Sequence, residues 1–70
     1  MSGLEARLLA AHSEGEKQAL VTLYEEAATA AKTPEAQGFF LTQAYVYALE
    51  TGHPKAADLH LRLKASGREA

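Results

Sequence analysis

Three histidines are the residues of this chain whose chemistry is best suited to metal binding or proton transfer. His53 and His60 are seven residues apart, so a single helix would place both on the same face. Two helical turns separate them by about 10.5 Å along the axis, which is too far for both to bind one ion easily. A site formed by His12, His60 and a carboxylate would require the fold to bring distant segments together. We therefore expect no metal and no cofactor.

The chain also has no convincing candidate residue for nucleophilic or acid–base catalysis. The chain has no cysteine, and its serines stand at expected helix ends, where capping explains them: Ser2, Ser13 and Ser66. Glu25 and Glu26 are adjacent, but we expect both to face water as part of a solvated surface. The five glycines are scattered and form no phosphate-binding pattern. We predict that the protein is not an enzyme.

The three tyrosines point to interfaces, because this residue type is favoured where one end is buried and the other is wet. Tyr45 and Tyr47 would differ in direction by about 200° on one helix, so they cannot both face the same core. Either one packs internally while the other contacts a partner, or both reach the surface. We favour the first interpretation, with Tyr47 at the partner side.

The chain has 70 residues, which is enough for one domain. A domain of this size buries only about 60% of its unfolded surface. Small domains without disulfides often oligomerise, so we expect a homodimer. Apolar residues make up 47% of the sequence and many are alanines, which favour helix. An all-α fold is predicted.

The net charge of −2 gives no electrostatic basis for nucleic-acid binding. Basic residues are concentrated after residue 51 and acidic residues before it. This distribution indicates either a solvated last helix or a basic strip that meets an acidic partner, which could be another copy. No apolar run approaches the roughly 20 residues of a membrane span, and the first residues do not resemble a secretory signal. We expect a cytoplasmic protein that does not bind membranes.

Local signals predict four helices. Ser2 and Glu5 can form a capping box for a helix that runs to about residue 13, and Gly15 ends it in a left-handed turn. A second helix is expected over residues 16–32. Thr33, Pro34 and Glu35 favour the start of a third helix, which runs to about Thr51. The segment Gly52-His53-Pro54 opens a fourth helix that ends near Ser66, and residues 67–70 are expected to fray.

The third predicted helix is apolar around nearly its whole circumference. Such a helix is either buried on all sides or covered by a partner on its second side. We expect the second arrangement, because 70 residues cannot enclose it alone.

The two halves of the chain echo each other at a spacing of 37 residues. Leu4, Ala11, Gly15, Ala19 and Ala28 recur as Leu41, Ala48, Gly52, Ala56 and Ala65. Periods of about 20–50 residues are typical of stacked helical arrays. The pattern predicts one domain, 1–70, built from two helix–turn–helix units over residues 2–32 and 34–66.

This layout resembles the tetratricopeptide repeat (TPR) family, which stacks pairs of antiparallel helices. The first copy reads Leu4-x2-Arg7-Leu8-x2-Ala11-x3-Gly15, and the second reads Leu41-x2-Ala44-Tyr45-x2-Ala48-x3-Gly52. The motif is degenerate, because Leu8 and Tyr45 occupy positions where the family places a small residue. The resemblance implies four antiparallel helices in two stacked units, and the alternative is a simple four-helix bundle.

Members of this family bind peptides or helices along the inner face of their first helices. The resemblance implies an apolar strip with a polar rim on the first and third helices. With Tyr47, the partner-binding residues are Leu9, His12, Phe39, Thr42, Gln43, Val46, Tyr47 and Leu49. The strip could instead pack inside the chain or against a second copy. We predict a small protein–protein interaction module that self-associates; the alternative is a helical bundle that binds a metal or small molecule through histidines and tyrosines.

Overall fold

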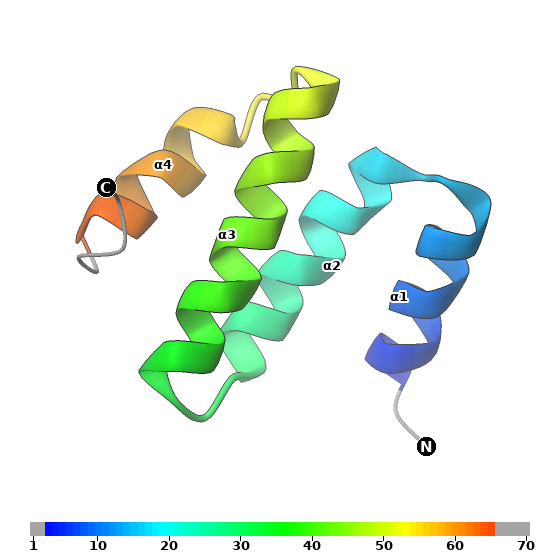
Figure 1. Ribbon diagram of the computed structural model, residues 1–70, viewed down its shortest axis with the longest axis horizontal. Coiled ribbons are helices and arrows are strands. Elements are labelled where there is room, and N and C mark those ends of the chain that lie inside the picture. Colours follow the sequence, from blue (N-terminus) through cyan, green and yellow to red (C-terminus); the bar gives the residue numbers. More distant parts are fainter. Residues whose placement is uncertain (1–2, 66–70) are drawn as a thin grey trace.

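The computed structural model describes residues 3–65 and confirms an all-α fold (Figure 1). The described residues form four helices: α1 (Gly3–Glu14), α2 (Lys17–Ala30), α3 (Pro34–Thr51) and α4 (Ala56–Ala65). Ser2, Ser66 and the tail at 67–70 lie outside the described residues, so the predicted capping box at Ser2 and the frayed tail lie outside them too.

The boundaries of α3 follow from its local signals. The Thr33 hydroxyl accepts a hydrogen bond from the Ala36 N–H at 3.1 Å, and Pro34 occupies the first turn. Gly52 ends the helix in the left-handed conformation, with φ of 63°. The His53 N–H then donates to the Ala48 carbonyl at 2.8 Å, which satisfies a carbonyl at the end of the helix. The predicted start and end of this helix are confirmed.

The connection between α1 and α2 differs slightly from the prediction. Gly15 has φ of 67°, as expected for a left-handed turn. Ser13 lies inside α1, and Glu16 precedes α2 without a side-chain capping bond. Helix α2 therefore begins one residue later than predicted, at Lys17. It ends at Ala30, two residues before the predicted end.

Consecutive helices pack on one another in chain order, with the most extensive packing between α2 and α3. The Cα atoms extend over 31 × 28 × 15 Å, so the molecule is flattened. Figure 1 shows that α2 lies between α1 and α3 and runs antiparallel to both. Leu4 and Leu8 of α1 pack against the cluster that joins α1 to α2.

The core consists of two clusters that share half-buried aromatic rings. One cluster joins α2, α3 and α4 through Val21, Ala28, Leu41, Ala44, Ala48, Leu59 and Leu63. The other joins α1 and α2 through Ala11, Leu20 and Leu23. Tyr24 and Tyr47 pack against both clusters, so these two tyrosines connect them.

Helix α3 is only partly enclosed by the rest of the chain. Leu41, Ala44 and Ala48 are buried against its neighbours, whereas Phe39, Val46 and Leu49 remain exposed. Among the described residues, no helix is long and apolar enough to cross a membrane.

Glu25 differs from the expectation that it faces water. Its side chain is only 13% exposed and lies between Lys55 Nζ at 3.3 Å and Arg62 Nη1 at 3.4 Å. Helix α4 brings both cations over α2, so this carboxylate is partly desolvated and paired. Glu26 does face water, where it pairs with Arg7 at 2.8 Å.

Candidate functional site

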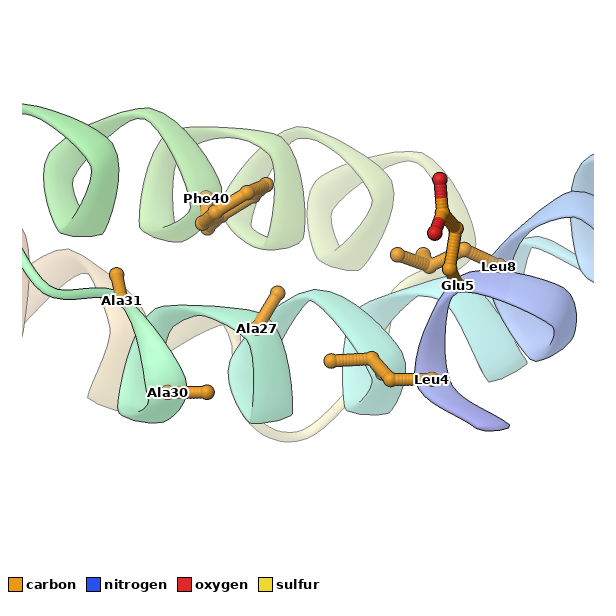
Figure 2. A pocket seen from close by; sticks show the side chains of 7 residues that line it. All are labelled: Leu4, Glu5, Leu8, Ala27, Ala30, Ala31 and Phe40. Atoms are coloured by element: carbon orange, nitrogen blue, oxygen red, sulfur yellow. The ribbon is translucent and has the colours of Figure 1, made fainter. Parts of the chain in front are cut away.

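An apolar groove lies between α1 and α3, with α2 as its floor (Figure 2). Its volume is about 400 Å³. The lining comes from all three helices: Leu4, Glu5, Leu8, Ala27, Ala30, Ala31 and Phe40. Glu5 is the one charged side chain among these lining residues, so the groove is an apolar surface with an acidic edge.

Small residues on α2 open this groove between α1 and α3. Ala27, Ala30 and Ala31 are spaced three and four residues apart, so they share a face of the chain at the end of α2. Their short side chains leave room above α2, which is the floor of the groove. Leu4 and Leu8 form one wall from α1, and Phe40 forms the other from α3, as Figure 2 shows.

A cluster of aromatic rings adjoins the groove. Tyr24 stacks on Phe40 with ring centroids 6.1 Å apart, and on Tyr47 at the same distance with nearly parallel planes. His12 meets Tyr24 and Tyr47 edge to face at 5.8 and 6.0 Å. These contacts join α1, α2 and α3 beside the groove and hold its walls at this end.

The cluster also contains a polar pair. His12 Nε2 and the Tyr24 hydroxyl are 2.8 Å apart, which is hydrogen-bonding distance. Burial, and secondarily the nearby Tyr47 hydroxyl, raise the pKa of Tyr24 above its ordinary value. Tyr24 therefore keeps its phenolic proton to a higher pH than a free tyrosine does.

The four predicted apolar residues of the partner strip all lie at the surface. The exposed fractions are 67% for Leu9, 57% for Phe39, 41% for Val46 and 57% for Leu49. The alternative in which this strip packs inside the chain is therefore wrong. Phe39 and Val46, two turns apart, share one line along α3, and Leu49 lies about 60° to its side.

The other predicted residues have intramolecular contacts. His12 and Tyr47 belong to the aromatic cluster and contact each other across α1 and α3. The Thr42 hydroxyl donates to the Gly38 carbonyl at 2.8 Å, and Gln43 is half-buried. Of these four residues, His12 and Thr42 are exposed, whereas Gln43 and Tyr47 are half-buried.

Tyr45 and Tyr47 point to different sides of α3, as their spacing predicts. Tyr47 packs on Tyr24, whereas Tyr45 stacks on His60 of α4 with centroids 5.6 Å apart. Both rings are therefore covered in part by the chain itself and remain partly exposed, so contact of one of them with a partner stays a prediction.

The histidines serve separate local roles. His53 Nδ1 accepts from the Lys55 N–H at 3.1 Å, at the turn before α4, while His60 belongs to the stack with Tyr45. Within residues 3–65, no three histidine, aspartate or glutamate side chains are grouped so that they could hold a metal ion.

The sequence did not identify the groove itself. Leu4 and Leu8 on the first helix, and the alanines at the end of the second, are also what an ordinary core-facing stripe contains. The pattern Ala27-x2-Ala30-Ala31 was the available signal, because clustered alanines leave space between neighbouring helices.

No protein-family model, curated protein or solved structure matches this chain. Its class is defined by the fold and the site alone: a small, flattened protein of four helices with an apolar groove on one face.

Proposed function

We propose that this protein is a non-enzymatic, cytoplasmic interaction module whose groove binds the apolar face of a partner helix. The observation that carries the proposal is the apolar groove between α1 and α3, next to exposed Leu9 and Phe39. Helix-in-groove binding uses such surfaces, with apolar anchors at positions i, i+3, i+4 and i+7 of the partner.

The groove suits a helix with basic flanks. Leu4, Leu8 and Phe40 form apolar walls, and the alanine floor allows another helix to approach closely. The Glu5 carboxylate lies at the edge and would attract a lysine or arginine of the partner. The expected partner is therefore an amphipathic helix that carries leucine-like anchors and positive charge.

A designed peptide can test this proposal without knowledge of the natural partner. The probe is a helical peptide with leucine at i, i+3, i+4 and i+7 and lysine elsewhere. Two control peptides are used. One has the same composition with its leucines at scrambled positions, and the other keeps the leucine positions but carries glutamate in place of lysine. Chemical-shift changes of the protein's backbone amides report where each peptide binds.

The lysine peptide should shift the amides of Leu4, Leu8, Ala27 and Phe40, with an affinity in the micromolar to millimolar range. Glu5→Lys should reverse the preference between the lysine and glutamate peptides, while Glu14→Lys, on the same helix but outside the groove lining, should not. Binding outside the groove, or a preference unchanged by Glu5→Lys, would contradict the proposal.

A further inference from the structure

The last helix is covered on one side only. Helix α2 is buried on two sides, because Leu20 and Leu23 pack with α1 while Val21 packs with α3 and α4. Helix α4 is buried through Leu59 and Leu63. Leu61 points about 160° away from Leu59 and is 63% exposed.

The repeat spacing shows which part of α3 belongs to the same open side. A shift of 37 residues relates the first unit to the second, so that His12 corresponds to Leu49 and Tyr24 to Leu61. In the first unit, His12 and Tyr24 contact each other and Tyr47 of the second unit. In the second unit, the corresponding Leu49 and Leu61 are exposed. We call Leu49 and Leu61 the terminal face.

We propose that the terminal face is the dimer interface, and that it pairs with the terminal face of a second copy about a two-fold axis. This inference does not depend on the groove: the terminal face lies on α3 and α4, while the groove is lined from α1, α2 and the start of α3. Either proposal can fail alone.

Head-to-tail stacking would place the terminal face of one copy on the outer side of the first unit of the next copy. The residues on that side disfavour this arrangement. The α3 residues Ala44 and Tyr47, which face the first unit, correspond by the same shift to Arg7 and Ala10. Arg7 is half-exposed and paired with Glu26 at 2.8 Å. An apolar terminal face placed there would meet the Arg7–Glu26 ion pair and the small Ala10, in place of the Ala44 and Tyr47 that the second unit presents to the first. A two-fold arrangement instead places leucine against leucine.

The charges near the terminal face allow it to meet its own copy. Asp58 and Lys64 are both exposed on α4, three residues before and three after Leu61, and their charges offset. Glu50 on α3 is paired with Lys17 at 3.0 Å. Two copies therefore approach without net repulsion, which a self-complementary interface requires.

Sedimentation velocity over a range of concentrations tests the dimer. The wild type should form a species no larger than a dimer, and Leu61→Glu should be monomeric while keeping the wild-type helical circular dichroism. Leu9→Glu places the same charge on an equally exposed leucine of α1 and should still dimerise. A wild type that stays monomeric, assembles beyond a dimer, or dimerises despite Leu61→Glu overturns the proposal.

Crosslinking gives an independent measurement, because the chain contains no cysteine. Leu61→Cys should form a covalent dimer rapidly under mild oxidation, since the two-fold axis brings this position near its counterpart. Leu9→Cys should crosslink at the slow rate of random collision. Equal rates for the two variants would refute the arrangement, whatever the peptide experiment on the groove shows.

Discussion

Replacing Glu25 by glutamine tests whether α4 is held to α2 by a partly buried carboxylate. The glutamine keeps the size of the side chain but removes the charge that faces Lys55 at 3.3 Å and Arg62 at 3.4 Å. Hydrogen bonds to charged groups, such as the one from Arg62 to Glu25, contribute about 1.5–3 kcal/mol. Both cations are partly exposed, so solvent screening reduces this, and we expect a loss of about 1–2 kcal/mol. In a domain of this size, that corresponds to a fall in Tm of roughly 5–15 °C.

The neighbouring residue provides a matched control. Glu26→Gln removes only the exposed ion pair with Arg7, which should contribute about 0–1 kcal/mol. Thermal unfolding followed by circular dichroism compares the two variants, and a Glu25→Gln, Arg62→Gln double variant measures the coupling of that pair. The reasoning is refuted when Glu25→Gln costs no more than Glu26→Gln, or when Glu25 and Arg62 show no coupling.

Three further predictions concern single contacts. Thr33→Ala should destabilise the fold by about 1 kcal/mol in urea unfolding because α3 loses its N-cap, whereas Thr33→Ser should be nearly neutral. Gly52→Ala should also lower the free energy of unfolding by about 1 kcal/mol. Nothing lies within 4 Å of the added Cβ, so this loss comes from the backbone φ of 63° alone. Gly3→Ala is the control, because Gly3 has no positive φ. The raised pKa of Tyr24 means that the folded state holds its phenolic proton more tightly than the unfolded chain does. Stability should therefore fall as pH rises past the ordinary value of 10.0, and this slope should be smaller in Tyr24→Phe. Equal slopes for wild type and Tyr24→Phe would contradict the last prediction.

The sequence predicted those features that depend on neighbours along the chain. Thr33, Pro34 and Gly52 act within a single turn, so the ends of α3 followed from residue types alone. The exposed strip on α3 followed from its apolar circumference, because a short chain has too few residues to cover it.

Features that depend on how helices lie against each other were missed. The pairing of Glu25 depends on α4 reaching across to α2, over a separation of 37 residues to Arg62. The groove depends on how α1 and α3 are placed on either side of α2, which neither Leu4 nor Leu8 determines. The sequence pattern gave the faces of each helix but not the distances between them.

The wall of the groove that α1 supplies is held by a small number of contacts. This helix is joined to α2 and α3 by buried Ala11, by the half-buried Leu4 and Leu8, by the contacts of His12 and by the exposed Arg7 pair. Its amide hydrogens should consequently exchange with solvent faster than those of α3, because a segment with few buried contacts opens without global unfolding. If a partner helix binds in the groove, it contacts both α1 and α2, so we expect its binding to slow the exchange of the α1 amides.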